Sequence, residues 1–264
     1  MNFLETIIAH KREEVAERKK AILRARLEDM PKFEYPSKSL RQALLEHDPA
    51  IIAEVKKASP SRNVIRDRFD PLLTARELVH AGASALSVLT DRKFFQGDIK
   101  FIELMRDFVS VPILRKDFII EPYQLYEAKA YGADAVLLIA AVLERQEILD
   151  LAAEASSIGL EVIAEVHNED EIEMVESESI QIIGINNRDL ETFETDITTS
   201  MRLRKYIPAD KVVVSESGIT RRQEIDQLRS HGIRAFLIGE HLMRAENPGK
   251  ALQTLLEAKG ASEG

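Results

Sequence analysis

Two charged residues stand two positions apart at the end of an apolar segment near the start of the chain. Glu54 and Lys56 belong to residues 51–56, with Pro49 just before the segment and Ser59-Pro60-Ser61 just after it. An apolar run closed by such breakers indicates a buried β-strand. Side chains two apart share one face of a strand, so this carboxylate and this ammonium point the same way. Taken alone, the pair is more typical of an ion pair at a strand end than of a catalytic site.

Later apolar segments end in the same manner. The residues at their ends include a second lysine, two more carboxylates and an amide, namely Lys116, Glu165, Glu216 and Asn186. If these side chains converge with Glu54 and Lys56 on one enclosed mouth, their charges set each other's pKa, as acid–base catalysis requires. A purely structural charge network is the alternative interpretation. Arg115 and Asp117 flank Lys116, and we interpret them as a structural ion pair.

A regular alternation of strands and helices must position these groups. Apolar segments predict eight strands, at residues 51–55, 85–89, 111–115, 134–139, 161–165, 181–185, 211–215 and 234–238. Amphipathic segments predict eight helices, at residues 71–81, 98–108, 121–131, 144–158, 168–176, 196–205, 220–231 and 247–258. The strands are continuously apolar, which is typical of parallel strands buried on both faces. Eight such units predict an α/β fold, a (β/α)8 TIM barrel, whose functional groups lie at the C-terminal ends of the strands.

An amphipathic extension precedes the first strand. Residues 2–28 predict one helix whose apolar stripe includes Phe3, Ile7 and Val15, and residues 39–46 predict a second, short helix. The apolar stripe must cover something, which is either an open end of the barrel core or the functional site. We expect a single domain that consists of this extension at 1–48, the barrel at 49–258 and a disordered tail at 259–264.

Two glycine-containing loops near the end of the chain indicate an anion site. Ser217-Gly218 precedes a helix that begins near Thr220, and Gly239-Glu240 precedes a short helical turn. Free N–H groups at the start of a helix attract anions, and the loops after the last two strands of such barrels are the usual phosphate site. The alternative is that each glycine serves only a turn. Phe95 and Phe118 are placed to wall an aromatic substrate, although either one alone is more often part of a core.

Composition excludes several classes of partner. The 264-residue chain has a net charge of −9 and a pI near 5.3, so neither nucleic acid nor an anionic membrane is an expected partner. It has no cysteine, which excludes disulfides and thiol chemistry, and its six histidines lack metal-ligand spacing, so we predict no metal. No apolar run is long enough to span a membrane, and charged residues occupy the N-terminal segment where a signal peptide needs an apolar core. We expect a cytoplasmic protein that is a monomer, with a homodimer as the alternative.

Four motifs, in order along the chain, resemble the indole-3-glycerol phosphate synthase family. They are Ile52-Ala53-Glu54-Val55-Lys56-Lys57-Ala58-Ser59-Pro60-Ser61, Leu114-Arg115-Lys116-Asp117-Phe118, Gly184-Ile185-Asn186-Asn187-Arg188-Asp189-Leu190 and Ser215-Glu216-Ser217-Gly218-Ile219. The resemblance covers the whole chain, including the N-terminal extension. It implies a decarboxylase (a carboxy-lyase) of tryptophan biosynthesis. Such an enzyme closes the indole ring of 1-(2-carboxyphenylamino)-1-deoxyribulose 5-phosphate, releasing CO2 and water and forming indole-3-glycerol phosphate.

The resemblance also implies roles for individual residues. It places the general acid at Lys116, the second acid/base at Glu165 and a further active-site carboxylate at Glu216. It assigns Lys56 to the substrate carboxylate, with Glu54 and Asn186 holding the lysine and the substrate hydroxyls in place. Contacts to the aromatic ring and the rest of the substrate fall on Phe95, Phe118, Leu137, Leu237 and Arg188, and contacts to the phosphate on Ser59, Ser217, Gly218, Gly239 and Glu240. His241 departs from the small residues that are usual at its position.

The implied chemistry suits these groups without a cofactor, because the substrate nitrogen supplies the electrons for ring closure. A lysine acts as an acid near neutral pH when its pKa falls below about 10.4, and we expect Lys56 to be the neighbouring cation that lowers the pKa of Lys116. Two other functions stay open from the residues alone. One is an isomerase of a ribosylamine phosphate, which the lack of cysteine and the long extension disfavour. The other is a non-catalytic phosphometabolite-binding module, which the presence of Lys116 with Glu165 disfavours.

Overall fold

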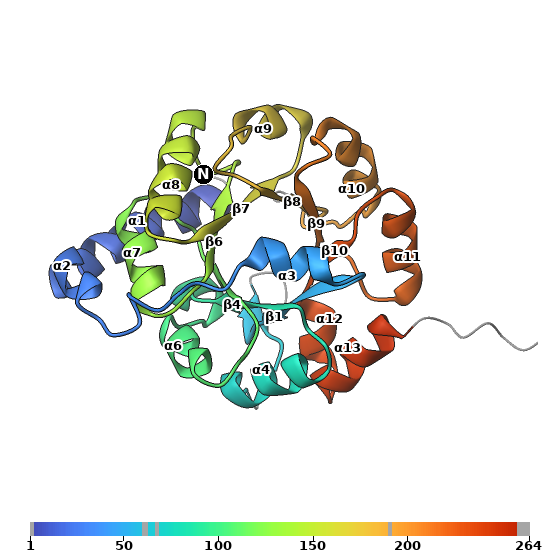
Figure 1. Cartoon of the computed structure of the whole chain (residues 1–264), viewed down its shortest axis with the longest axis horizontal. Helices are drawn as coiled ribbons and strands as arrows, with labels where there is room; N and C mark the ends of the chain where they lie inside the picture. Colours follow the sequence, from blue (N-terminus) through green and yellow to red (C-terminus); the bar gives the residue numbers. More distant parts are fainter. Residues whose placement is uncertain (1–2, 60–62, 67–68, 190–191, 258–264) are drawn as a thin grey trace, which may run out of the picture.

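Eight parallel strands close into a barrel in the computed structural model (Figure 1). In chain order they are β1 (Ala50–Val55), β4 (Ala85–Leu89), β5 (Ile113–Lys116), β6 (Ala135–Ile139), β7 (Glu161–Val166), β8 (Ile182–Asn186), β9 (Val212–Glu216) and β10 (Ala235–Ile238). Strand β1 closes the barrel by pairing with β10 on one side and β4 on the other. The predicted (β/α)8 barrel is confirmed, and each strand begins within two residues of its predicted start.

The structure describes residues 3–59, 63–66, 69–189 and 192–257. The tail that we predicted to be disordered, at 259–264, lies outside these residues, as do Pro60, Ser61 and Leu190 of the sequence motifs. Within the described ranges, no helix combines the length and the apolar character needed to cross a membrane.

Helices surround the barrel and connect successive strands (Figure 1). The eight predicted helices are α4 (Pro71–His80), α6 (Lys100–Arg106), α7 (Tyr123–Ala130), α8 (Arg145–Ser157), α9 (Glu169–Met174), α10 (Thr198–Leu203), α11 (Arg222–Ser230) and α13 (Pro248–Leu256). Several begin after a favourable capping residue. Asp70, Asn168 and Asn247 each accept a hydrogen bond from a backbone N–H in the first turn of α4, α9 and α13.

Short elements at the ends of the strands complete the fold. The helical turn predicted after Gly239 is α12 (Glu240–Arg244). The structure adds α5 (Arg92–Phe95), the 3-10 turn η1 (Arg204–Tyr206) and a hairpin of β2 (Ala58–Ser59) and β3 (Asn63–Val64), none of which the sequence pattern predicted. Such elements are only two to four residues long, so they show no periodicity that a sequence pattern reveals.

Two apolar layers explain why the strand segments are apolar throughout. Ile52 and Leu114 belong to the cluster inside the barrel, whereas Ile51 and Val88 belong to the cluster between the strands and the surrounding helices. Because neighbouring residues of a strand point to opposite faces, both faces of each strand are buried in apolar surroundings. Polar side chains therefore enter the barrel mainly where the strands end.

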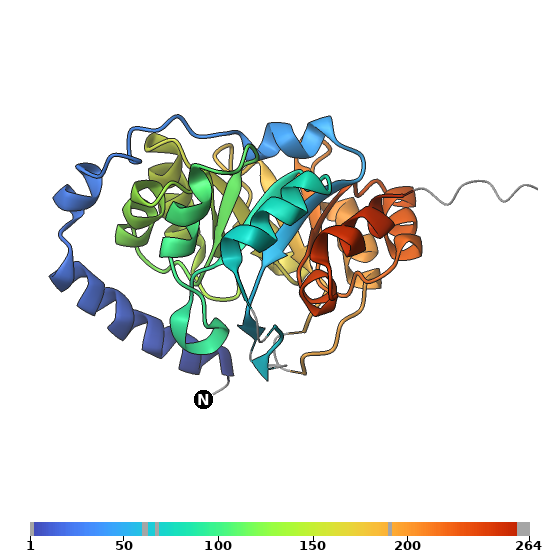
Figure 2. The same cartoon turned by 90° about the horizontal axis from the view of Figure 1, so that it is seen from below.

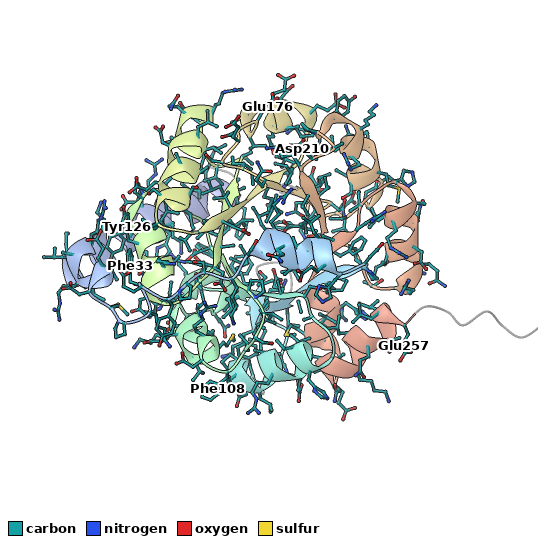
Figure 3. The ribbon with its side chains drawn as sticks, in the orientation of Figure 1. Phe33, Phe108, Tyr126, Glu176, Asp210 and Glu257 are labelled. Atoms are coloured by element: carbon teal, nitrogen blue, oxygen red, sulfur yellow. The ribbon has the colours of Figure 1, made fainter. Side chains whose placement is uncertain are left out.

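The N-terminal extension is divided into three helices rather than two. These are α1 (Phe3–Ala21), α2 (Arg24–Glu28) and α3 (Leu40–Glu46), so the prediction of one helix over 2–28 is wrong. The chain leaves the helix at Leu23, whose backbone is extended, with φ −69° and ψ 149°. The break lets α2 and the turn after it pack on α7, where Phe33 stacks on Tyr126 with ring centroids 6.1 Å apart (Figure 3).

Helices α1 and α3 lie at opposite ends of the barrel (Figure 2). Leu40 and Leu44 of α3 are buried in the apolar cluster inside the barrel, at the end where the strands begin. Leu4 and Ile7 of α1 line the cavity at the end where the strands finish. Capping the open core and covering the site were given as alternatives, and both occur in different parts of the extension: α3 caps the open core and α1 covers the site.

Candidate active site

A cavity of about 830 Å³ opens at the C-terminal ends of the strands. Helix α1 and the β2–β3 hairpin lie at this end of the barrel (Figure 2). Its lining includes every site residue that the sequence predicted. These are the charged and amide groups Glu54, Lys56, Lys116, Glu165, Asn186 and Glu216, the groups Phe95, Phe118, Leu137, Arg188 and Leu237, and the loop residues Ser59, Ser217, Gly218, Gly239 and Glu240. The volume lies within the range of about 300–1,000 Å³ that is usual for small-molecule sites.

Lys116 lies between two buried carboxylates at the centre of this cavity. Its Nζ donates hydrogen bonds to Glu216 Oε2 at 2.5 Å and to Glu165 Oε2 at 3.1 Å. Lys116 and Glu216 are the last residues of β5 and β9, and Glu165 is the last but one of β7; the three are alternate strands of the barrel. Alternate strands of such a barrel contribute side chains to one layer, so the three groups meet although the strands are not neighbours.

Glycines on the intervening strands make room for the carboxylates. A Cβ atom at Gly184 of β8 would meet Glu216 Oε1, and one at Gly239 after β10 would meet Glu54 Oε1, both closer than van der Waals contact allows. Neither glycine has a positive φ, so the requirement is for space and not for backbone freedom. Gly239 therefore has a reason to be glycine that is independent of phosphate binding.

Burial and charge push the pKa values of the two carboxylates in opposite directions. Burial raises the pKa of Glu216, and although Lys116 opposes this, the neighbouring Glu165 and Glu54 help to bring the pKa to about 7. Burial also raises the pKa of Glu165, but Lys116, His167 and Asn186 together outweigh that effect and lower it. Two carboxyl groups in one pocket with separated pKa values are suited to different roles in proton transfer.

The expected cause of a low pKa for Lys116 is not found. Burial acts to lower this pKa, but the charges of Glu216, Glu165 and Glu54 outweigh burial and raise it above the ordinary lysine value. Lys56 is not the neighbour that we expected, because its ammonium pairs with the Glu54 carboxylate. Lys116 is therefore held in its charged form in the ligand-free protein, and the expectation of a lowered pKa is wrong.

Asn186 and Arg188 form the side of the cavity next to Glu165. Asn186 Nδ2 donates to Glu165 Oε1 at 3.1 Å, and its Oδ1 accepts from the backbone N–H of Arg188 at 3.0 Å. The Arg188 guanidinium donates to the backbone carbonyl of Phe193 at 3.0 Å and lies 3.5 Å from Glu240 Oε2. These contacts hold the guanidinium in place in the lining of the cavity.

The loop after β9 is a tight turn with two successive residues in the left-handed backbone region. Ser217 and Gly218 have positive φ values of 68° and 80°, and Asn187 Nδ2 donates to the Ser217 carbonyl at 3.0 Å. A non-glycine residue with positive φ is uncommon, and such strain tends to occur at functional sites. Nearby, Glu240 pairs with Arg188 and Arg244, each at 3.5 Å, and burial lowers the pKa of His241.

Sequence reasoning missed Lys11, which docks α1 onto the site. Its Nζ lies 2.8 Å from Asp117 Oδ1 and 2.8 Å from Asp91 Oδ2, and its side chain is fully buried. Asp117 also pairs with Arg115 at 3.0 Å, so the predicted ion pair forms within a larger buried network. The signal for Lys11 was its position between Ile7 and Val15 on the apolar stripe of α1, where a lysine is unexpected.

His167 is the second residue that sequence reasoning missed. Its Nε2 lies 3.5 Å from Glu165 Oε1, and its Nδ1 lies 3.1 Å from Glu171 Oε2. The available signal was its position two residues after Glu165, since residues two apart share a strand face. The structure also places Phe95 and Phe118 side by side, with ring centroids 6.2 Å apart. Among the described residues, no group of three or more His, Cys, Asp or Glu is placed to hold a metal ion.

Comparison with known proteins gives a consistent family. The family model described as indole-3-glycerol phosphate synthase matches residues 4–255. A protein of that name from Bacteroides thetaiotaomicron is 48% identical over 257 residues, which cover 97% of this chain and 98% of the relative. Another of the same name, from Burkholderia vietnamiensis, is 45% identical over 258 residues, with 95% of this chain and 97% of the relative covered.

Solved structures with low sequence identity share the fold. A chain of the tryptophan synthase complex from Pyrococcus furiosus has a TM-score of 0.59 at 15% identity and covers 79% of this chain and 98% of its own length. A protein titled KGPDC from Streptococcus mutans has a TM-score of 0.62 at 12% identity, covering 80% of this chain and 96% of its own length. At these identities, the likeness concerns the barrel alone.

Proposed function

This chain belongs to the indole-3-glycerol phosphate synthase family, and from that premise we propose which of its groups carry out the reaction. The substrate is 1-(2-carboxyphenylamino)-1-deoxyribulose 5-phosphate, and the product is indole-3-glycerol phosphate. The observation that carries the proposal is the position of Lys116 between Glu165 and Glu216 inside the cavity. The protein acts on this small phosphorylated molecule as a cytoplasmic monomer and needs no cofactor.

Ring closure begins as the aromatic carbon attacks the ketone of the substrate. Lys116 donates a hydrogen bond and then a proton to the ketone oxygen. Its raised pKa keeps it loaded with that proton at neutral pH, and its charge stabilises the developing negative charge on the oxygen. Glu216 then returns a proton to Lys116, because a carboxyl group with a pKa of about 7 exchanges protons efficiently near neutral pH.

Two later steps complete the indole ring. Loss of CO2 restores the aromatic ring, and loss of the hydroxyl group with a neighbouring C–H proton forms the new double bond. Glu165 serves the second step, taking the C–H proton as a base and assisting departure of the hydroxyl group as an acid. Its lowered pKa gives it the ionised form that a base requires at the outset.

Binding groups surround this centre. Lys56, held by Glu54 at the end of β1, pairs with the carboxylate that later leaves as CO2. Phe95, Phe118, Leu137 and Leu237 enclose the aromatic ring, and Arg188 contacts the substrate from the opposite rim. Backbone N–H groups of the loops at Ser217-Gly218 and Gly239-Glu240, with Ser59, hold the phosphate.

The test is an assay for indole formation. Purified protein is mixed with the carboxyphenylamino substrate, and indole absorbance and fluorescence are followed, with the K116M variant as the control. We expect turnover by the parent protein and strongly reduced turnover by the variant. Absence of product from the folded parent protein would refute the proposed function.

A further inference from the structure

The proposed reaction consumes one proton from outside the substrate in each turnover. The substrate carboxylate is negatively charged, whereas CO2, water and the indole ring that are formed are neutral. One proton must therefore enter the site for each carboxylate lost. Glu165 and Glu216 are almost completely buried, and α1 covers the cavity, so bulk water does not reach them freely once the substrate is bound.

His167 is placed to supply this proton. Its Nε2 lies 3.5 Å from Glu165 Oε1, slightly beyond a hydrogen bond of about 2.9 Å. This Nε2 atom has no hydrogen-bond partner among the residues that the structure describes. On the other side of the ring, Glu171 Oε2 lies 3.1 Å from Nδ1 and also accepts the backbone N–H of His167 at 2.7 Å. Glu171 therefore fixes the ring with Nδ1–H toward itself and Nε2 toward Glu165.

The surroundings of His167 favour its charged form. Burial lowers the pKa of this imidazole, but Glu171, Glu165 and Glu216 outweigh burial, so the pKa is raised above the usual value of 6.5. His167 and Glu171 also line a second cavity, of about 740 Å³, next to the first. The other charged groups that line the second cavity are Arg188, Asp189, Glu194, Asp196 and Arg202.

We propose that His167 holds the proton that each turnover consumes and passes it to Glu165 after the hydroxyl group has left, while the product still fills the first cavity. In this step the Nε2–H bond breaks, its electron pair stays on Nε2, and an O–H bond forms on Glu165. Glu165 then gives its proton to Lys116 as Lys116 gives one to Glu216, the carboxylate left without its proton, because Lys116 Nζ lies 3.1 Å from Glu165 Oε2 and 2.5 Å from Glu216 Oε2. His167 is left neutral with its Nδ1–H on Glu171. It takes up a proton again from water through the second cavity. This inference rests on the proposed function and adds to it a residue that acts through Glu165.

The test compares H167Q and H167N with the parent protein over a range of pH. In the parent, kcat falls as pH rises through the pKa of His167, because His167 is then neutral and has no proton to give. We expect both variants to lose this dependence and to show kcat reduced roughly 10- to 100-fold near neutral pH, less than the roughly 10²–10⁴-fold of a positioned acid, because His167 acts through Glu165. KM should stay within about twofold, and added imidazole should restore part of the lost rate, which a structural defect would not allow.

A second variant gives a sharper readout. E171Q keeps a hydrogen-bond acceptor next to Nδ1 but removes a charge that favours the imidazolium, so the alkaline fall of kcat should move to lower pH. H231Q, at an exposed histidine that follows α11, is the matched control and should leave the profile unchanged. If the parent protein forms no indole product, the proposed function fails. If the parent is active and H167Q has the parent's kcat and pH profile, only the role of His167 is overturned.

Discussion

Lys11 Nζ lies 2.8 Å from Asp117 Oδ1, and Asp117 directly follows Lys116 in the chain. A helix that covers the site is thus anchored next to the residue to which we assign the first proton transfer. The same lysine also pairs with Asp91, the N-cap of α5, which carries Phe95. One buried ammonium therefore ties together the cover, a loop of the aromatic wall and the strand that ends in Lys116.

Replacing Lys11 by methionine should weaken both the fold and the site. Removing one partner of a buried ion pair leaves the other charge uncompensated, which typically costs about 3–5 kcal/mol. We expect the free energy of unfolding to fall by about this amount and KM to rise, measured by denaturant titration and steady-state kinetics. K19M is the matched control on the same helix: the Lys19 side chain is 50% exposed, and its pair with Glu121 should contribute about 0–1 kcal/mol. Equal effects of the two variants would contradict the anchoring role of Lys11.

The K116M variant should lose catalysis but keep binding. A single positioned acid contributes roughly 10²–10⁴-fold to the rate, so kcat should fall by about that factor. The apparent Kd for the indole-3-glycerol phosphate product should change little, because the ring and phosphate contacts stay in place. Titration of the product with the variant measures this Kd directly. A kcat within about threefold of the parent value would remove Lys116 from the proposed role.

Lys56 should discriminate between ligands with and without a carboxylate. If it pairs with the substrate carboxylate, K56A should weaken binding of a substrate analogue that retains this group more than binding of the product. The difference should be about 1.5–3 kcal/mol, the usual contribution of a hydrogen bond to a charged group. Calorimetric Kd values for both ligands test this. Equal weakening of the two would show that Lys56 does not recognise the carboxylate.

Glu216 should make the stability of the protein depend on pH. Its pKa is about 7 in the folded protein against 4.5 for the unperturbed group, so the folded state retains a proton that the unfolded chain releases at lower pH. The unfolding free energy should therefore decrease as pH rises from about 4.5 to 7, by up to roughly 3 kcal/mol at 1.36 kcal/mol per pKa unit. E216Q should lack this decrease. Denaturant titrations of the parent and of E216Q at several pH values measure the free energy of unfolding. The same pH dependence in both proteins would contradict the raised pKa of Glu216.

Gly218 should matter for phosphate binding beyond its backbone conformation. A side chain at Gly218, whose φ is +80°, is strained and would lie 3.3 Å from Thr195 Cβ at the edge of the cavity. G218V should raise KM strongly, because a branched Cβ blocks close approach to the backbone N–H groups. G232V is the control, since Gly232 has a φ of +79° and open space around it, so it carries the strain without the obstruction. A similar KM for the two variants would place the phosphate elsewhere.

Glu240 should contribute little to phosphate affinity. Its carboxylate pairs with Arg188 and Arg244, each at 3.5 Å, and we assign phosphate contact at this position to the backbone N–H. E240Q should therefore change KM only slightly. The inhibition constant for inorganic phosphate should also change only slightly. A tenfold change of KM in E240Q, with little change in G218V, would contradict the assigned phosphate site.

The barrel was predictable from the sequence because its signals are local and repeated. Each strand is a continuous apolar run, and glycines such as Gly82 and Gly132, with positive φ values of 103° and 91°, mark the ends of the preceding helices. The order of strands along the chain is also their order around the barrel, so that charged residues at strand ends had to meet at one mouth. The convergence of Lys116, Glu165 and Glu216 followed from this topology.

Features that depend on contacts between distant segments were decided only by the tertiary structure. Nothing local predicts the break at Leu23, because it depends on how α2 and the following turn pack on α7. The spacing of Glu54 and Lys56 predicted their ion pair, but sequence position does not reveal which carboxylates lie beside Lys116. Lys56 pairs with Glu54, Lys116 with Glu165 and Glu216, and this pairing raises the pKa of Lys116 where the sequence suggested a lowered one. Residue types and strand ends determined the contents of the site, but the pKa values depend on distances of a few ångströms, which only the folded chain sets.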